Sequence, residues 1–193
     1  MGLLWADGSN RTDNGTITLM LQERDKHILD DISVEMESDR PLYFKNISKS
    51  RPNQQNCYAF TIYNRHISDM LVQYGMCSNK TYVLEWPNDL SDELIPHFLR
   101  GFMDGDGTIG HNRLGWVGTV MMMDKIKSIL HDVFDIDANM EDTNNNIIKR
   151  LMVYRRSDIK RILDWIYKDA DMKLERKYQK YLESFCINSS CLN

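Results

Sequence analysis

Two short segments of the chain share one pattern, in which two small residues four positions apart enclose an apolar run and are followed by Asp-Gly. The segments are 2–8 and 101–107, and their aspartates, Asp7 and Asp106, lie 99 positions apart. Small residues at this spacing leave a flat helix face, so that two helix backbones can approach closely. A Gly directly after a helix often adopts the left-handed conformation that ends it. The pattern therefore predicts two short helices packed through Gly2, Ala6, Gly101 and Gly105.

Such a helix pair brings one carboxylate from each helix to the same end of the pair. Two carboxylates held close together repel each other unless a cation lies between them, and divalent metals prefer oxygen ligands. In outline this arrangement is that of a metal-dependent phosphodiester-cleaving site. The alternative is that Asp7 and Asp106 are ordinary surface-turn residues, which are common before Gly. The duplicated spacing favours the paired site.

The hydrophobic pattern after each Asp-Gly is also repeated. In the first half, alternation of apolar residues predicts strands, and a period near four predicts helices. The expected strands are 16–21, 41–47 and 57–63, and the expected helices are 25–36 and 68–74. The second half predicts a hairpin over 108–123, helices over 124–134 and 158–167, and strands at 138–142 and 147–155. A charged helix is expected over 174–185.

The two Asp-Gly segments carry a family resemblance. Leu99-Arg100-Gly101-Phe102-Met103-Asp104-Gly105-Asp106-Gly107 resembles the second signature of LAGLIDADG homing endonucleases, and Met1-Gly2-Leu3-Leu4-Trp5-Ala6-Asp7-Gly8 resembles the first, cut short at its amino end. The resemblance spans nearly the whole chain. It implies an α/β (α+β) fold of two pseudo-symmetric αββαββα halves, 1–87 and 88–193. Their antiparallel sheets would straddle DNA, with the signature helices packed at the interface.

The same resemblance implies a function. It is that of a site-specific endonuclease that hydrolyses both strands of its DNA target, acting as a monomer with Mg²⁺, or with Mn²⁺ in its place. Asp7 and Asp106 are the acids that match the family's metal ligands, and Asp104, whose place Trp5 takes in the first signature, is expected not to bind metal. The positions assigned to the metal site are Ala6, Asp7, Gly8, Gly105, Asp106 and Gly107.

The family resemblance also places one basic residue of the active site after the last helix of each half. Lys80 and Lys177 are the candidates, because a lysine there would polarise solvent and offset phosphate charge. The two segments align with an offset of 97 rather than 99, which leaves Lys173 and Arg176 as alternatives in the second half. The competing interpretation is that these lysines are simply solvated.

Polar residues that suit DNA cluster in the predicted strands and their connections. Arg, Gln and Asn have the bidentate geometry that fits base edges in the major groove, and the alternative is a solvated sheet face. The candidate DNA-binding residues are Lys45, Lys49, Arg51, Gln54, Gln55, Tyr58, Arg65, Asn145, Lys149, Arg150, Tyr154, Arg155 and Arg156.

The net charge of −4 is unusual for a DNA-binding protein, since such proteins usually carry a basic excess. The acidic residues would therefore have to lie away from DNA, on segments such as 23–39 and 164–171. The sequence contains no apolar run of membrane-spanning length, so no membrane partner is expected. Its four cysteines form no metal-ligand spacing. They predict reduced thiols in a cytoplasmic or other reducing compartment that contains DNA, such as a bacterium, an organelle or a phage-infected cell.

Two other functions fit the same pattern. One is a non-cleaving nucleic-acid-binding protein on the same scaffold, either an RNA splicing maturase or a DNA-binding regulator. The other is an inactive remnant of the nuclease. The first signature helix has scarcely two turns in this sequence, and a helix that short must be held in place by its partner.

Overall fold

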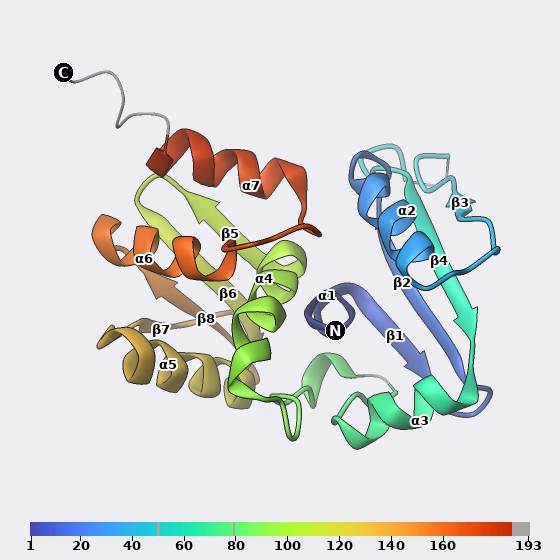
Figure 1. Ribbon diagram of the computed structural model, residues 1–193, viewed down its shortest axis with the longest axis horizontal. Helices are drawn as coiled ribbons and strands as arrows, with labels where there is room; N and C mark the ends of the chain where they lie inside the picture. Colours follow the sequence, from blue (N-terminus) through green and yellow to red (C-terminus); the bar gives the residue numbers. More distant parts are fainter. Residues whose placement is uncertain (50, 79, 187–193) are drawn as a thin grey trace.

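The computed structural model describes residues 1–49, 51–78 and 80–186, and Figure 1 shows two halves on either side of a central helix pair. The first half comprises α1 (Gly2–Asp7), β1 (Gly8–Arg11), β2 (Thr16–Gln22), α2 (Lys26–Glu35), β3 (Tyr43–Lys45), β4 (Cys57–Tyr63) and α3 (Arg65–Gln73). The second comprises α4 (Ile95–Asp106), β5 (Gly107–Gly110), β6 (Arg113–Thr119), α5 (Val120–Phe134), β7 (Asn139–Asp142), β8 (Ile148–Val153) and α6 (Arg156–Ile166), and α7 (Glu175–Tyr181) follows. Both halves are αββαββα, which confirms the predicted fold class.

Each half contains one four-stranded antiparallel sheet. The strand order is β1-β2-β4-β3 in the first sheet and β5-β6-β8-β7 in the second, so the two sheets have the same topology. In each sheet the strand that follows Asp-Gly is at one edge, and the long central strands carry the apolar residues of the core. The signature helices therefore enter both sheets at equivalent places.

Helices α1 and α4 pack against each other through their small residues. A Cβ atom at Gly2 would lie 2.8 Å from the backbone nitrogen of Phe102, and one at Gly101 would lie 2.7 Å from that of Leu3. A Cβ at Gly105 would collide with the Cβ of Ala6. Larger side chains at these glycines would push the two backbones apart.

The glycines after the signature helices differ from the sequence-based expectation. Gly8 has φ −89° and ψ 166°, and Gly107 has φ −97° and ψ 164°, so both are extended and the predicted left-handed stop is wrong. A Cβ at Gly8 would lie 2.6 Å from the Leu4 carbonyl oxygen, and one at Gly107 would lie 2.5 Å from that of Met103. Glycine is needed here because each strand leaves its helix too closely for a side chain.

The hydrophobic core continues from one half into the other. Trp5 on α1 is fully buried, contacts the ring of Phe98 edge-on at 5.8 Å, and donates a hydrogen bond from Nε1 to the Glu85 carbonyl oxygen at 3.0 Å. The same cluster includes Leu84 from the connection between the halves and Trp116 from β6. The domain boundary at residue 87 stays a prediction.

An apolar cavity of about 340 Å³ lies beside the amino end of α1, between the core of the first half and α4. Its walls include Leu3 and Leu4 of α1, Ile28 of α2 and Phe60 of β4, with Arg100 at one edge. In the second half, the first two turns of α4 supply Phe98 and other apolar side chains to the core. Helix α1 has only six residues, whereas α4 has twelve.

Several element boundaries depend on capping side chains. Helix α5 begins at Val120 because the Thr119 hydroxyl accepts a hydrogen bond from the Met122 N–H, so the expected strand over 120–123 is helical. Helix α3 begins at Arg65 because the Asn64 side chain caps it. Strand β1 falls outside the strands that the alternation of apolar residues predicts. None of the described helices is long and apolar enough to cross a membrane.

Candidate active site and nucleic-acid surface

Helices α1 and α4 end side by side with Asp7 and Asp106. The Oδ2 atom of Asp7 lies only 2.8 Å from where a Cβ of Gly105 would be, so this carboxylate rests against α4 one residue before Asp106. Both aspartates are solvent-exposed at their outer edges. The structure therefore brings together the two acids that the duplicated motif singles out.

The surroundings of these carboxylates disfavour their charged forms. Partial burial, followed by repulsion from Asp106, raises the pKa of Asp7 to about 6. Burial also raises the pKa of Asp106, although Lys80 and Lys177 act in the opposite direction. Two neighbouring exposed acids whose pKa values are both raised repel each other, and a bound cation would relieve this repulsion. Such a pair is typical of a cation-binding site.

Lys80 and Lys177 hold equivalent positions in the two halves. The Nζ of Lys80 donates hydrogen bonds to the carbonyl oxygens of Trp5 and Ala6 at the end of α1, the latter at 2.8 Å. The Nζ of Lys177 donates to the carbonyls of Met103, Gly105 and Gly107 at 2.5, 3.2 and 2.8 Å. Each lysine thus satisfies carbonyls that the end of its signature helix leaves free.

Both lysines are more easily deprotonated than a lysine in water. Burial is the main cause in each case, and it lowers the pKa of Lys177 to about 8, with Arg176 acting in the same direction. Burial also lowers the pKa of Lys80, while Asp106 and Asp7 act against it. The four charged groups consequently interact as one cluster.

The donor set around Asp7 and Asp106 fits a hard divalent cation. It consists of two carboxylates and of backbone carbonyls such as those of Ala6 and Gly105, all of them oxygen ligands of the kind that Mg²⁺, Mn²⁺ and Ca²⁺ take. No group of three or more His, Cys, Asp or Glu residues that could hold a metal occurs in the described part of the chain. Water or a bound phosphate would have to complete the coordination sphere. Gly8 and Gly107, also assigned to the metal site, start the strands beyond the two aspartates.

The third acid of the motif, Asp104, points away from this cluster. Its carboxylate is buried and accepts hydrogen bonds from the Tyr167 hydroxyl at 3.1 Å and from the Leu174 N–H at 3.0 Å. Burial raises its pKa to about 6 despite these bonds. Asp104 therefore anchors the segment before α7, in keeping with the expectation that it binds no metal.

The alternative basic residues of the second half lie elsewhere. Lys173 donates to the Ala170 carbonyl at 2.7 Å, and Arg176 donates from Nε to both carboxylate oxygens of Asp25 at 3.0 Å. Lys177 alone of these reaches the carbonyls of α4.

Each sheet has one face covered by helices and one outer face. The strand register assigns the apolar residues to the covered face and their sequence neighbours to the outer one. Exposed side chains on the outer faces include Ser9, Arg11, Gln22, Tyr43, Lys45 and Tyr63 in the first sheet, and Thr108, Arg113, Asn139, Arg150 and Tyr154 in the second. We call these eleven residues the outer-face set.

Two strand residues among the DNA-binding candidates lie on the covered faces. Tyr58 pairs with Leu21 and Phe44 and packs against the core of the first half. Lys149 pairs with Asp142 and forms an ion pair with it at the end of the second sheet. Because a strand alternates its faces, these two side chains lie on the face opposite Lys45 and Arg150, and their role in DNA binding stays a prediction.

Other candidates are committed to contacts within the protein. Arg65 donates to the Thr12 carbonyl, and Arg156 donates to the carbonyls of His111 and Ser184 and lies over the ring of Phe185. Arg155 stays largely exposed beside Asp158.

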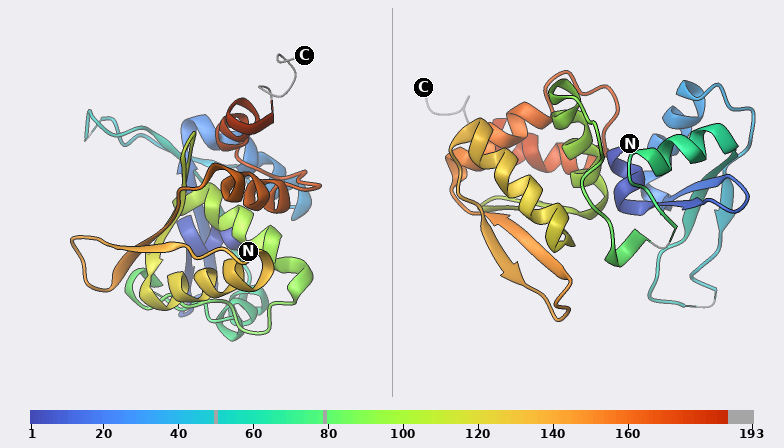
Figure 2. Two further views of the ribbon diagram at one scale, coloured as in Figure 1. Left: turned by 90° about the vertical axis from the view of Figure 1, so that its left-hand side faces the viewer. Right: turned by 90° about the horizontal axis from the view of Figure 1, so that it is seen from below.

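The remaining candidates lie in two long connections. Lys49, Arg51, Gln54 and Gln55 are exposed between β3 and β4, and Asn145 lies between β7 and β8, where its side chain accepts a hydrogen bond from the Ile147 N–H at 2.8 Å. Figure 2 shows that both connections project beyond the sheets on the same side of the molecule. They would flank anything that lies across the outer faces.

Sequence reasoning did not select several members of the outer-face set. Arg11, Tyr43 and Arg113 are examples, and all three are exposed. The alternation of Ile17, Leu19 and Leu21 predicts which face of β2 is buried, and it could have been used to assign the neighbouring side chains to the outer face. Strand β1 was not recognised because its buried residues include Asn10 rather than an apolar side chain.

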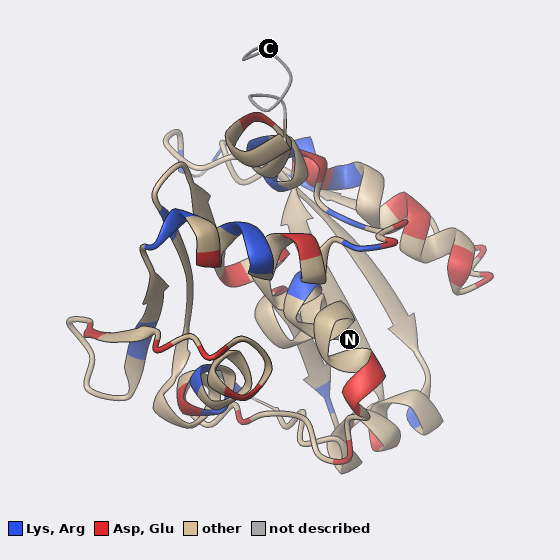
Figure 3. Cartoon of the chain, turned by 60° about the vertical axis from the view of Figure 1, so that its left-hand side comes forward, with Lys and Arg blue, Asp and Glu red and all other residues tan. Residues whose placement is uncertain are grey.

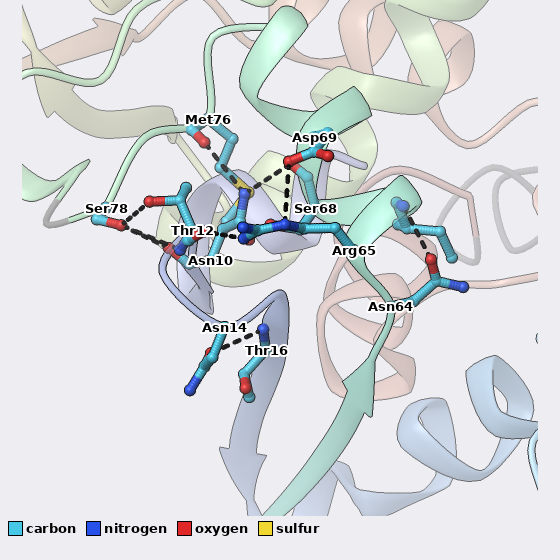
Figure 4. Close-up of polar contacts among 11 residues, drawn as sticks. Asn10, Thr12, Asn14, Thr16, Asn64, Arg65, Ser68, Asp69, Met76 and Ser78 are labelled. Carbon is cyan, nitrogen blue, oxygen red and sulfur yellow. Dashed lines mark hydrogen bonds and ion pairs between the residues drawn. The ribbon is translucent and has the colours of Figure 1, made fainter.

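Asn10 organises the segment that leads to Lys80 (Figure 4). Its buried side-chain amide donates to the carbonyl of Ser68 at 3.0 Å and accepts from the Ser68 hydroxyl at 2.7 Å. The Ser78 hydroxyl donates to the Asn10 carbonyl at 3.0 Å. These bonds tie β1 to α3 and to the residues just before Lys80.

Charge is unevenly distributed over the molecule. Figure 3 shows acidic residues spaced along α2 and basic residues on α6 and among the strands. Four charged residues are exposed on the outer faces, Arg11, Lys45, Arg113 and Arg150, and all are basic. Glu141, half-buried opposite Arg150, is an acid on the same face. The negative net charge thus arises largely outside the outer faces.

No protein-family model and no curated protein matches this chain. Solved structures do match it. The LAGLIDADG homing endonuclease I-LtrWI bound to target DNA has a TM-score of 0.60 at 14% identity, covering 98% of this chain and 89% of its own. The LAGLIDADG homing endonuclease I-GzeII in complex with its DNA target has a TM-score of 0.61 at 12% identity, covering 95% and 86%. I-SmaMI bound to uncleaved DNA in the presence of calcium ions has a TM-score of 0.60 at 10% identity, covering 94% and 87%.

Proposed function

From this likeness in fold to the LAGLIDADG homing endonucleases, we propose that the chain is a site-specific DNA endonuclease that hydrolyses one phosphodiester bond in each strand of a duplex target. The observation that carries the proposal is the convergence of Asp7 and Asp106 at the paired ends of α1 and α4, with Lys80 and Lys177 on the neighbouring carbonyls. Because fold alone does not specify chemistry, the proposed cleavage activity depends on these four residues.

The cofactor proposed for this site is Mg²⁺, with Mn²⁺ as a substitute. Asp7 and Asp106 would hold it together with the carbonyls of Ala6 and Gly105, and the use of calcium with I-SmaMI supports a divalent ion in proteins of this fold. When bound, such an ion lowers the pKa of water and stabilises charge on a phosphoryl oxygen.

Three groups of residues would have separate roles in the reaction. The carboxylates supply negative charge where the cation binds, and the two ammonium groups offset the charge of the scissile phosphates and orient solvent. The outer-face set and the two projecting connections would contact the DNA, with Arg and Asn reading base edges and Lys contacting phosphates. Tight packing of α1 against α4 keeps the two reaction centres at a fixed separation.

We further propose that one chain binds one duplex, in a reducing compartment that contains DNA. The pseudo-twofold relation between the sheets supports this stoichiometry, because each sheet can serve one half of a target.

A non-cleaving DNA or RNA binder on the same scaffold is the second candidate. It would not need both carboxylates and both lysines, and the presence of all four favours the nuclease.

The test is incubation of the purified protein with DNA from the region flanking its own gene, with Mg²⁺, Mn²⁺ or EDTA. The proposal expects a staggered double-strand cut with either metal and binding alone in EDTA. Asp7→Asn is the matched control, since it keeps the size of the side chain and removes its charge. Binding without cleavage in both metals would favour the non-cleaving binder, and neither binding nor cleavage would refute the proposed function.

A further inference from the structure

Arg176 and Lys177 are neighbours on α7 but point in different directions. Successive residues of a helix are about 100° apart around its axis. Lys177, which is 4% exposed, reaches the carbonyls at the end of α4 in its own half. Arg176 instead reaches across to the first half, where its Nε lies 3.0 Å from both carboxylate oxygens of Asp25.

Asp25 receives this contact in a buried position. Its side chain is 4% exposed, whereas that of Arg176 is 34% exposed. Asp25 immediately precedes α2 and makes no capping hydrogen bond with its side chain. A buried carboxylate must be paired, so Asp25 fixes where Arg176, and with it α7, can lie. Figure 1 shows α7 and α2 at the same edge of the molecule, on opposite sides of the central helix pair.

Helix α7 depends on such contacts because it is short. Its seven α-helical residues continue into a π-helical segment, Leu182–Cys186, and the twelve residues together are still marginal for a helix in isolation. Its other anchors are the Asp104 carboxylate at its amino end and the packing of Tyr178 on Tyr167, with ring centroids 5.3 Å apart, and both belong to the second half. Two contacts relate α7 to the first half: Leu174, directly before α7, is buried in the apolar cluster that contains Leu29, and the ion pair adds the polar contact.

The first half holds its own lysine in a different way. The segment before Lys80 is tied by the Asn10 and Ser78 hydrogen bonds, all of which lie within that half. The hairpin of the second half is two residues shorter than that of the first, so the position equivalent to Asp25 is Met122, and the nearest acid is Asp124 inside α5. Asp124 is exposed, and within the described ranges no ion pair involves it. Among the described residues, the ion pair between the halves therefore occurs on the Lys177 side alone, while on the Lys80 side the Thr119 hydroxyl donates a hydrogen bond to the Leu84 carbonyl.

We infer that the Asp25–Arg176 pair is a positioning device that sets Lys177 relative to the first half, and that its loss impairs cleavage of one DNA strand more than the other. The strand-specific part of this inference rests on the proposed function. Neither residue forms a hydrogen bond with the aspartates of the site in the described structure. The charge of Arg176 acts on Asp7 at longer range, where it lowers the pKa of that carboxyl against the larger effect of burial, and the direct structural effect of the pair is on the position of Lys177.

The test uses the full chain with Asp25→Asn, and Asp124→Asn as the matched control. The first readout needs no DNA: the protein is treated with an acylating N-hydroxysuccinimide ester, and the labelling rates of Lys177 and Lys80 are followed by mass spectrometry. Asp25→Asn should raise the labelling rate of Lys177 several-fold and leave that of Lys80 unchanged. Asp124→Asn should change neither.

The second readout is cleavage of a target whose two strands carry different labels. In Asp25→Asn, one strand should be cut roughly 10- to 100-fold more slowly than in the wild type, because small misplacements of a reacting group carry costs of this size. Nicked DNA should then accumulate. The slowed strand should be the one that Lys177→Met also slows. A core variant of the second half, Leu130→Ala, controls for general loss of stability and should slow both strands alike.

Equal slowing of both strands in Asp25→Asn, or unchanged labelling of Lys177, would overturn the inference. If the wild-type protein cut no DNA at all, the proposed function would fail, and the labelling experiment would still decide whether the pair positions Lys177.

Discussion

Asp7 and Asp106 are held where their charges oppose folding in the absence of a cation. Folding raises the pKa of Asp7 from 3.8 to about 6, so the folded state binds this proton more tightly than the unfolded state. The contribution of Asp7 to the free energy of unfolding therefore increases as the pH falls from about 7 to about 4. In EDTA, Asp7→Asn should raise the melting temperature at about pH 7.5 and flatten its dependence on pH. A lower melting temperature for this variant at that pH would contradict the interpretation.

The same substitution should have the opposite effect on catalysis. Asp7→Asn or Asp106→Asn should reduce double-strand cleavage by roughly 100-fold or more, because the metal site loses one of its two charged ligands. DNA affinity in EDTA should stay within about threefold of the wild type, since neither carboxylate has an attractive contact with phosphate. Cleavage rates and binding isotherms on one target measure both effects. Wild-type cleavage by either variant would remove these residues from the mechanism.

The lysines provide a separate test at the residue level. Lys80→Met and Lys177→Met keep most of the side-chain volume but remove the charge that offsets the scissile phosphate. Each should lower the cleavage rate by about 10²-fold or more, the size of effect typical of a positioned proton-transfer group. Single-turnover kinetics with saturating protein separates this from weaker binding. Equal loss of binding and cleavage would instead indicate a role for these lysines in holding DNA.

At the level of elements, strand β8 offers adjacent basic residues on opposite faces. Arg150 is exposed on the outer face, whereas Lys149 lies on the covered face and pairs with Asp142. Arg150→Ala should weaken DNA binding by about 1–3 kcal/mol and relax specificity if the side chain reads a base, or lower the salt slope by about one if it contacts phosphate. Lys149→Ala should leave affinity almost unchanged. The reverse order would place DNA on the other face of the sheet.

Helix α1, with six residues, is too short to be stable without its contacts to α4. The apolar cavity of about 340 Å³ beside its amino end is lined in part by Met1, Leu3 and Leu4. Adding about six helix-forming apolar residues before Met1 should fill part of this cavity. A gain of about 2 kcal/mol would raise the melting temperature by roughly 4–8 °C in a chain of this size. Calorimetry measures the gain, and the cleavage site should not change, because Asp7 lies at the other end of the helix. A cleavage site or cleavage rate that changed with the extension would contradict this separation of stability from chemistry.

At the level of the whole molecule, the negative net charge and the basic outer faces have a joint consequence. DNA binding should depend steeply on salt, with the logarithm of the binding constant falling linearly with the logarithm of salt concentration. The acidic residues along α2 should repel DNA and so disfavour its binding to that side of the molecule. Sedimentation of the complex should give one chain per duplex. Two chains per duplex would mean that a second copy supplies part of the DNA surface.

The fold class and the paired acids could be predicted from local sequence patterns. Both follow from local patterns: the alternation and helical spacing of apolar residues specify the elements, and the repeated Gly-x-x-x-small spacing that ends in Asp7 and Asp106 specifies how two of them pack. The candidate lysines could also be named from their place in the repeat. Sequence could not decide between Lys173, Arg176 and Lys177, because an offset of one residue in a short helix turns the side chain by about 100°.

Features that depend on contacts between distant segments could not be predicted in this way. Strand register moved Tyr58 and Lys149 to the covered faces and brought Arg11 and Arg113 to the outer ones, since a shift of one residue exchanges the two faces of a strand. The contact of Arg176 with Asp25 joins residues 151 positions apart. Such a contact leaves no trace in local sequence, because its energy comes from burying a charge that pairs with a partner in the other half.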